Sequence, residues 1–229
     1  MGLSKYLKIL PFFYFFQTRI VFNFNFILQF ICEIGTSIII FLFLLKPLYL
    51  DAIFLFILHY LAFISLYEIG YFINDTISVN YEKKPNKRFK IKKSIFFNFL
   101  FIILRLIFFI LLTFYLDLQN SYLWWFFYFF LIIIFSIHNF LSQVFLRLAT
   151  FQILSFLRFI APFFSILDTN YFFIIGNIVA LTYVPYRTLG YLVSKKITYK
   201  NISRNYLFQL LTFLPPIVFF LVIIILKFN

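Results

Sequence analysis

The side chains best suited to chemistry in this sequence lie in one polar stretch that separates two long apolar runs. The stretch starts with oxygen donors and continues with cations: Asn74, Asp75, Ser78 and Glu82, then Lys83, Lys84, Lys87 and Arg88. Three of the donors repeat every four residues, so they share one face if the preceding helix continues through them. Oxygen ligands followed by positive charges are what a phosphate site requires.

This order of residue types suits a phosphate ester held through Mg²⁺. Magnesium prefers hard oxygen ligands and commonly bridges one or two carboxylates to substrate phosphates. The predicted metal ligands are Asn74, Asp75, Ser78 and Glu82, with the two acids as the carboxylates. The cations would neutralise the phosphate charge, Arg88 through a bidentate fork and the lysines as point charges. A solvated loop whose acids balance its cations is the alternative that spacing alone leaves open.

The elements that carry this stretch are apolar enough to be membrane helices. Of the 229 residues, 64% are hydrophobic and only 12% are charged. Apolar runs of about 20 residues, long enough to cross a bilayer, recur along the chain. We predict an all-α integral membrane bundle of seven helices, or up to nine in a wider count, at Phe26–Leu45, Ile53–Phe72, Ser94–Tyr115, Ser121–Leu141, Thr150–Leu167, Tyr171–Val193 and Tyr206–Lys227.

The predicted organisation is a single transmembrane helical domain over residues 1–229. Residues 1–25 form an interfacial N-terminal segment, residues 73–93 a basic loop that holds the polar stretch, and residues 194–205 a second basic loop. The chain has 20 Lys and Arg against 7 Asp and Glu, and the cations gather at alternate ends of the spans. The positive-inside rule therefore places the N-terminus and both loops in the cytoplasm, as in a bacterial inner-membrane protein.

The net charge of +13 does not indicate a nucleic-acid partner. Its cations are scattered along membrane edges and are not gathered on one folded surface. Topology and attraction to membrane lipid explain this charge.

The polar stretch resembles the first aspartate-rich motif of the UbiA superfamily of intramembrane prenyltransferases. The family pattern, closest in the branch of decaprenyl-phosphate phosphoribosyltransferase, is matched at Tyr71, Asn74, Asp75, Pro85, Lys87 and Arg88. Ser78 and Glu82 stand where the family has aspartates. The resemblance implies a bundle whose two catalytic loops follow the second and sixth spans, on the cytoplasmic side.

A second similarity lies in the fifth predicted span, where Leu157-Arg158-x-x-Ala161 resembles a further motif of the same family. The family aspartate that stands eleven residues before this arginine is replaced by Arg147. The second acidic motif of the family also has no counterpart, because no Asp or Glu follows Asp168. The end of the sixth span and the loop after it offer the cations Arg187, Lys195 and Lys196 in its place.

The resemblance implies a transferase that acts on a polyprenyl phosphate or diphosphate with Mg²⁺ as cofactor. Asp75, Lys87 and Arg88 are then the catalytic residues, and the substrate-binding residues are Lys83, Lys84, Arg158, Arg187, Lys195 and Lys196. Two alternatives remain open. One is a non-catalytic protein with a UbiA-like fold and a lipid-binding or assembly role, and the other is a component of a small transporter.

Charged residues inside the predicted spans must pair or face a cavity, because charge in the bilayer interior is costly. Glu33 and Arg158 come to similar depths when rise per residue is counted from the cytoplasmic ends of their spans. We predict that they pair and hold their helices together, with Arg158 reaching a substrate phosphate as the alternative. Arg105 lies deeper, and the sequence offers no obvious partner for it.

Overall fold

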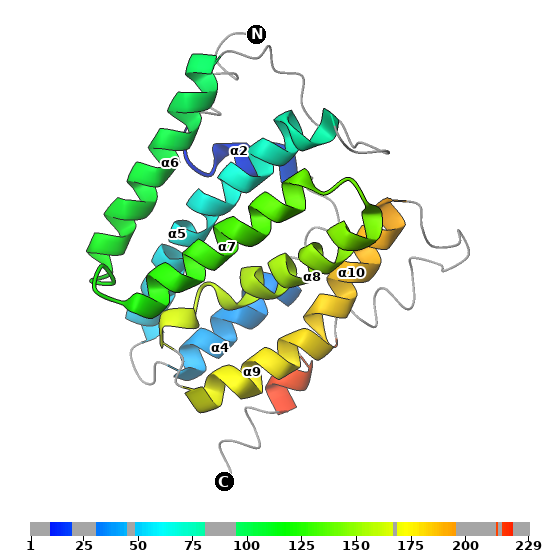
Figure 1. Ribbon diagram of the computed structural model, residues 1–229. Coiled ribbons are helices and arrows are strands. Elements are labelled where there is room, and N and C mark those ends of the chain that lie inside the picture. The colour runs from blue at the N-terminus through cyan, green and yellow to red at the C-terminus, as the bar shows by residue number, and fades with distance from the viewer. Residues whose placement is uncertain are drawn as a thin grey trace. The chain divides into compact units, whose positions relative to one another are not determined.

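The computed structural model describes residues 10–19, 31–44, 49–80, 95–166, 169–195, 214 and 217–221. Across these residues the chain forms helices and no strand, which confirms the all-α prediction (Figure 1). The helices belong to two compact units, one of Met1–Phe22 with Ile57–Arg147 and one of Asn23–Phe56 with Leu148–Asn229. We refer to these as the first and the second unit. The single transmembrane domain stays a prediction.

Four helical stretches among the described residues are long and apolar enough to cross a membrane. Three are α5 (Tyr49–Thr76), α6 (Ile95–Tyr115) and α7 (Tyr122–Phe140), and the fourth combines α9 (Thr169–Leu181) with α10 (Tyr183–Ser194). Their membrane-length portions have 26, 21, 19 and 25 residues, against the roughly 20 that a bilayer core needs. The total of seven to nine spans stays a prediction, and most of the last one, residues 206–227, lies outside the described residues.

The first unit is built on α5, α6 and α7, which pack through aromatic rings. Phe72 of α5 stacks on Phe101 of α6 with centroids 4.2 Å apart, and Tyr67 of α5 meets Phe135 of α7 edge to face at 4.6 Å. Gly70 permits this second contact, since a Cβ at that position would lie 2.5 Å from the Phe135 ring. The short helix α2 (Phe13–Arg19) adds Tyr14 to the same aromatic core.

The second unit contains a π-helical turn, η1 (Ile31–Gly35), followed directly by α4 (Thr36–Leu44), together with the start of α5. It also contains α9, α10 and the part of α8 from Leu148 onward, whereas the first turn of α8, up to Arg147, belongs to the first unit. The helix α8 spans Val144–Ile160. It contacts α10 through two aromatic pairs, Phe159 with Tyr183 at 4.9 Å and Phe151 with Tyr191 at 4.6 Å. Proline explains the break between α9 and α10. Pro185 lacks the N–H that would bond to residue 181, and its ring clashes with that carbonyl.

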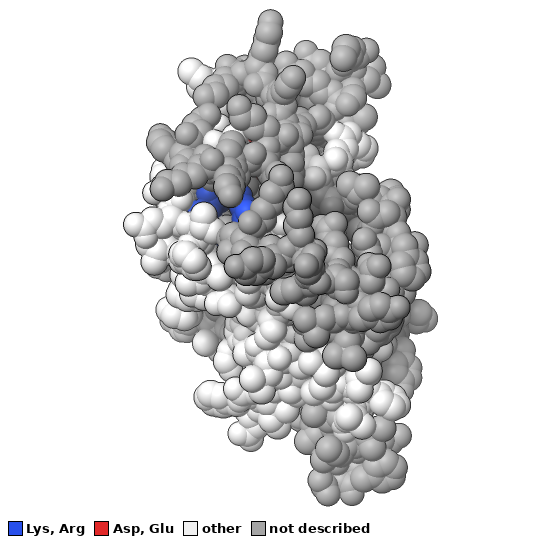
Figure 2. Space-filling model, turned by 90° about the vertical axis from the view of Figure 1, so that its right-hand side faces the viewer, with Lys and Arg blue, Asp and Glu red and all other residues white. Residues whose placement is uncertain are grey.

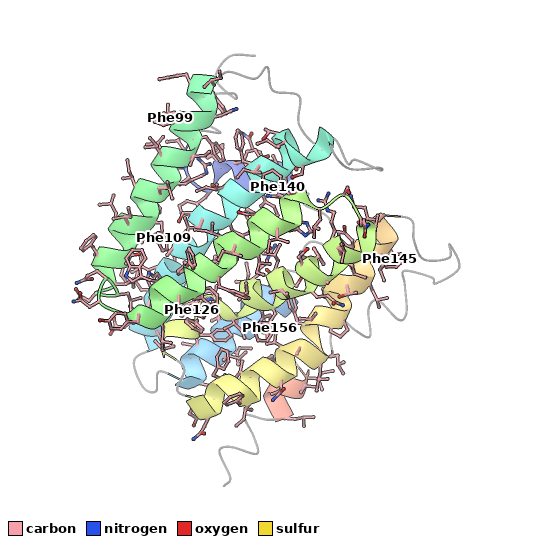
Figure 3. All side chains as sticks on the ribbon, viewed as in Figure 1. Phe99, Phe109, Phe126, Phe140, Phe145 and Phe156 are labelled. Carbon is pink, nitrogen blue, oxygen red and sulfur yellow. The ribbon has the colours of Figure 1, made fainter. Side chains whose placement is uncertain are left out.

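Large apolar side chains cover much of the described surface, as expected for helices that face lipid. Phe99, Phe126, Phe140 and Phe145 are exposed by 62, 67, 67 and 75% (Figure 3). On the face drawn in Figure 2, the described side chains are mostly uncharged, and the basic ones are confined to one small area. A surface of this kind is unfavourable in water and favourable in a bilayer.

Candidate functional site

The C-terminal end of α5 positions the first three residues of the polar stretch. The α-helix ends at Thr76, and Ser78–Asn80 form a 3-10 turn, η2. The helical face expected to run from Asn74 through Ser78 to Glu82 is therefore interrupted before Ser78. The rest of the predicted motif, Glu82, Lys83, Lys84, Lys87 and Arg88, lies outside the described residues.

Asp75 is buried and is held by a residue from far away in the sequence. The Tyr14 hydroxyl donates a hydrogen bond of 2.6 Å to Asp75 Oδ2. Tyr14 is itself fixed by edge-to-face contacts with Phe72 and Phe101, and only 1% of it is exposed. The amide of Asn74 lies 3.4 Å from the other carboxylate oxygen. The carboxylate is thus oriented by protein donors on both oxygens.

Arg147 completes the cluster from the first turn of α8. One terminal nitrogen of its guanidinium donates to Asn74 Oδ1 over 2.9 Å, and the residue is only 3% exposed. From the sequence, Arg147 was identified only as the residue that replaces a family aspartate. The sequence does contain a signal that could have identified Arg147 as part of a polar cluster. It is an arginine within the apolar run of residues 144–160, and such a charge must find a polar partner inside the fold.

The described residues supply only part of the predicted magnesium site. Such a site is normally built on carboxylate oxygens, and Asp75 is the one carboxylate that the structure shows in this cluster. Its oxygens accept hydrogen bonds, while the Asn74 oxygen accepts one from a cation. No group of three His, Cys, Asp or Glu that could hold a metal occurs in the described part of the chain. With Glu82 outside that part, the magnesium set stays a prediction.

Ser78 lies one turn beyond this cluster along the chain. It is 0% exposed, and its hydroxyl has no hydrogen-bond partner among the residues that the structure describes. A buried hydroxyl without a partner is unfavourable by about 1–3 kcal/mol, so the position favours a polar group beside it.

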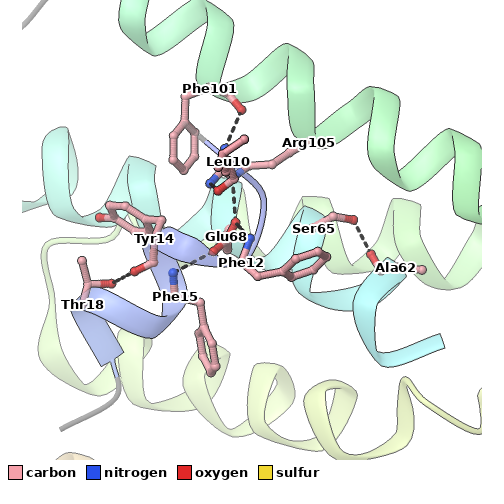
Figure 4. Close-up of polar contacts among 10 residues, drawn as sticks. All are labelled: Leu10, Phe12, Tyr14, Phe15, Thr18, Ala62, Ser65, Glu68, Phe101 and Arg105. Atoms are coloured by element: carbon pink, nitrogen blue, oxygen red, sulfur yellow. Dashed lines mark hydrogen bonds and ion pairs between the residues drawn. The ribbon is translucent and has the colours of Figure 1, made fainter. Parts of the chain in front are cut away.

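A second polar cluster in the first unit joins Glu68 of α5 to Arg105 of α6 (Figure 4). Glu68 accepts from Arg105 Nε at 2.8 Å and from the backbone N–H groups of Phe12 and Phe15 at 3.0 and 2.7 Å. Arg105 also donates to the carbonyls of Phe101 and Leu10, at 3.1 and 3.2 Å. This is the partner that the sequence did not offer for Arg105. We call this cluster the N-terminal clamp, because it ties residues 10–15 to two membrane-length helices.

The second unit holds a further cluster around Glu33, which lies in the π-helical turn. Arg158 of α8 donates to Glu33 Oε1, and the Tyr183 hydroxyl of α10 donates to Oε2 at 2.6 Å. The predicted Glu33–Arg158 pair is confirmed, and it links three helical elements. Arg187 of α10 also acts electrostatically on Glu33. The cluster therefore contains one carboxylate and two guanidinium groups.

The predicted substrate-binding residues that the structure describes fall together in this second unit. Tyr183, Arg187, Tyr191 and Lys195 repeat every four residues and share one face of α10 and its C-terminal end. The Arg187 guanidinium lies 5.8 Å from the Phe151 ring, and the Lys195 ammonium lies 5.9 Å from the Tyr191 ring. Lys196 lies outside the described residues. The structure thus groups the predicted site residues as Asn74, Asp75 and Ser78 in one unit and Arg158, Arg187 and Lys195 in the other.

Comparisons with protein-family models, with curated proteins and with solved structures find no match. The fold and the clusters define the chain as an all-helical protein with membrane-length helices and buried polar clusters. Membership of the UbiA superfamily stays a prediction from the sequence motifs.

Proposed function

We propose that this chain is a UbiA-like membrane transferase of seven to nine spans that acts on a polyprenyl phosphate or diphosphate at the cytoplasmic membrane face. One observation carries the proposal. Asn74, Asp75 and Arg147 form a buried polar cluster at the end of α5, only a few residues before the basic stretch of the motif. Buried charges at the end of a membrane-length helix are costly, and function is the common reason for their presence.

The chemistry of such a site is mainly charge stabilisation. In prenyl transfer the allylic carbon–oxygen bond breaks and its electron pair leaves with the diphosphate. The acceptor atom that bonds to the allylic carbon then releases its proton to water. Positive groups preorganised around the diphosphate lower this barrier, because they favour the charge of the leaving group without reorganisation. Arg147, Lys87 and Arg88 are proposed for that role, and Asp75 is proposed to orient the groups around it.

Within the second unit by itself, Arg187 and Lys195 are proposed as phosphate-binding residues, as the resemblance implies. Arg187 and Lys195 lie on one face of α10 and its C-terminal end. Arginine and lysine at such positions replace the charge of a metal ion, although not its coordination geometry. This assignment accounts for the missing acidic residues after Asp168.

A second candidate function is a non-catalytic lipid-binding or assembly protein with the same fold. The observation that favours it is the engagement of Asp75 by Tyr14 and of Asn74 by Arg147. Protein donors at these oxygens stabilise the folded structure on their own. A protein that has lost its chemistry retains such contacts.

Turnover by the purified protein in lipid nanodiscs tests the proposal. Radiolabelled polyprenyl diphosphates would be supplied with a pool of candidate acceptors, and phosphoribosyl diphosphate would be supplied with polyprenyl phosphate. We expect product from the native protein and a loss of about 100-fold in Asp75→Asn, because that charge orients the site. Asp117→Asn is the matched control, since Asp117 lies in an exposed turn. No product in any combination, with lipid phosphate still bound, would support the non-catalytic function.

A further inference from the structure

We propose that the turn between α6 and α7 is an anchor at the boundary between a phospholipid bilayer and water. The anchor consists of three exposed aromatic side chains with polar tips, Tyr115, Tyr122 and Trp125, which we call the aromatic anchor. Its partner is the headgroup region of a phospholipid leaflet, where such rings lie beside acyl chains and their polar tips lie in the wet headgroup layer. The inference goes beyond the proposed function, because it applies to a transferase and to a non-catalytic protein alike.

The three members of the aromatic anchor lie at nearly the same level of the hairpin. Tyr115 is the last residue of α6, and Tyr122 is the first residue of α7 (Figure 1). Trp125 follows on α7 and lies only about 4.5 Å further along the helix axis at the usual rise per residue. The three are exposed by 65, 91 and 42%. Amphipathic rings therefore mark the shared end of two membrane-length helices.

The residue types on either side of this level change in the order that a bilayer requires. The turn itself exposes the polar side chains of Asp117 and Asn120. In the adjacent turns of the two helices the exposed side chains are apolar, and the largest exposures are those of Leu111, Phe114, Phe126 and Phe129, at 59, 59, 67 and 64%. Polar groups, amphipathic rings and apolar side chains thus succeed one another as water, headgroups and acyl chains do. A protein partner would not require this order.

The backbone of the turn satisfies its own polar groups, as a chain must do where it borders hydrocarbon. The helix α6 ends in a Schellman motif, in which the N–H of Leu118 donates to the Thr113 carbonyl at 3.0 Å and that of Asp117 to the Phe114 carbonyl at 3.1 Å. Asp117 adopts the left-handed conformation of this motif, with a φ of 55°. Aspartate tolerates that conformation better than most residues. The helix therefore ends abruptly at the level of the aromatic anchor.

The two tryptophans give the hairpin a defined orientation. Trp124 Nε1 donates to Thr113 Oγ1 across the hairpin at 3.1 Å, and Trp124 is only 1% exposed. Trp125 Nε1 donates to the Gln119 carbonyl at 2.8 Å, while its ring meets Phe109 edge to face at 6.0 Å. The polar edge of Trp125 is thus directed to the turn and its ring to an apolar neighbour. This is the orientation that a membrane interface favours.

Depth-dependent quenching of tryptophan fluorescence by brominated lipids tests the inference. The chain has two tryptophans, and both lie in this hairpin, so the emission of the native protein reports on this place alone. The protein is reconstituted in phosphatidylcholine vesicles that carry bromine either near the headgroup or near the end of the acyl chains. We expect shallow bromine to quench at least about twofold more than deep bromine, because the exposed indole lies at the headgroup level.

Single-tryptophan variants assign the signal. Trp124→Phe leaves Trp125 as the reporter and should keep the preference for shallow bromine. Trp125→Phe leaves only the buried Trp124, and quenching by either lipid should be weaker. Because Trp124→Phe loses the hydrogen bond to Thr113, its unfolding is compared with that of the native protein. The native protein carries the same test if this variant does not fold.

The double variant Tyr115→Leu/Tyr122→Leu removes two polar tips of the aromatic anchor. We expect the turn to settle deeper, so that quenching by deep bromine rises relative to quenching by shallow bromine. Phe99→Leu is the matched control, because Phe99 is an exposed aromatic residue near the opposite end of α6 (Figure 3). This control should leave the ratio unchanged. An equal ratio in the double variant and the native protein would overturn the role of the two tyrosines.

Two results with the native protein would overturn the inference as a whole. Deep bromine that quenches as strongly as shallow bromine would place the turn within the hydrocarbon. Quenching by acrylamide from the water with no quenching by either lipid would place the turn away from the membrane. No substrate takes part in these measurements, so they are independent of whether the chain is a transferase.

Discussion

The N-terminal clamp of the first unit and the Glu33 cluster of the second unit each contain a buried glutamate–arginine pair, but their other partners differ. Glu68 accepts from two backbone N–H groups, and both members of its pair have fully buried side chains. Glu33 accepts a hydrogen bond from the Tyr183 hydroxyl and also interacts electrostatically with a second cation, Arg187. Backbone partners fix the path of the chain, whereas side-chain partners link separate helices.

This difference has a structural consequence for the site at the end of α5. The clamp fixes residues 10–15, and that segment carries Tyr14 to Asp75. Phe12 adopts a φ of 71°, which is unusual for an aromatic residue, and its N–H is held by Glu68. The clamp therefore acts on the site through a short rigid segment. Among the described residues, the hydrogen bonds given for Glu33 come from side chains, and they do not hold a backbone segment in this way.

Breaking the clamp should give the largest effect. Glu68→Gln leaves Arg105 buried without a compensating charge, and we expect a loss of about 3–5 kcal/mol in unfolding free energy. Unfolding in mild detergent, followed by tryptophan fluorescence, measures this loss. Limited trypsin digestion should also release the N-terminal segment sooner than in the native protein. Asp117→Asn removes an exposed acid and should leave both readouts unchanged. An unchanged stability of Glu68→Gln would show that the pair does not hold the unit together.

Removing a side-chain partner in the second unit should give a smaller effect. Tyr183→Phe keeps the ring that packs on Phe159 and removes the hydroxyl that donates to Glu33. We expect a loss of about 1.5–3 kcal/mol, the range for a hydrogen bond to a charged group. Tyr128→Phe is the matched control, because the Tyr128 hydroxyl is buried without a partner among the described residues. That change should leave stability unchanged or raise it, measured by the same unfolding experiment.

The tightness of packing gives a third comparison between the units. A Cβ at Gly70 would lie 2.5 Å from the Phe135 ring, whereas a Cβ at Gly176 would lie 3.5 Å from Phe156. Gly70→Ala should therefore destabilise by about 1–3 kcal/mol through overpacking. Gly176→Ala should be neutral or stabilising by up to about 1 kcal/mol, because alanine favours the helix. Thermal unfolding of both variants checks the difference, and equal shifts would contradict the close approach at Gly70.

Some tertiary contacts were readable from the sequence, and others were not. The Glu33–Arg158 pair could be predicted because both charges lie at similar depth in apolar runs, although 125 residues separate them. Arg105 and Glu68 are only 37 residues apart, but depth counting did not pair them. Their meeting involves the N-terminal segment, whose backbone supplies three of the five hydrogen bonds described for the clamp. Backbone donors have no signature in the sequence.

The contacts of the candidate site at the end of α5 could be predicted only in part. The motif located Asn74, Asp75 and Ser78, and the structure places the first two in contact. The motif did not identify Tyr14, which lies 61 residues from its partner Asp75, or Arg147, which lies 73 residues from its partner Asn74. The end of α5 at Thr76 was also missed, because the expected helical face assumed that the helix continued.

The sequence by itself determined that this chain is helical and that several of its helices are of membrane length. The hydrophobicity of a segment is the sum of the contributions of its residues. The length and composition of an apolar run are therefore sufficient to predict a helix of membrane length. Tertiary structure alone decided which polar groups meet, including Tyr14 with Asp75, Arg147 with Asn74 and Arg105 with Glu68. Such pairings depend on the rotation and depth of each helix. These are set by the packing of side chains such as Phe135 on Gly70, and that information is distributed over the whole fold.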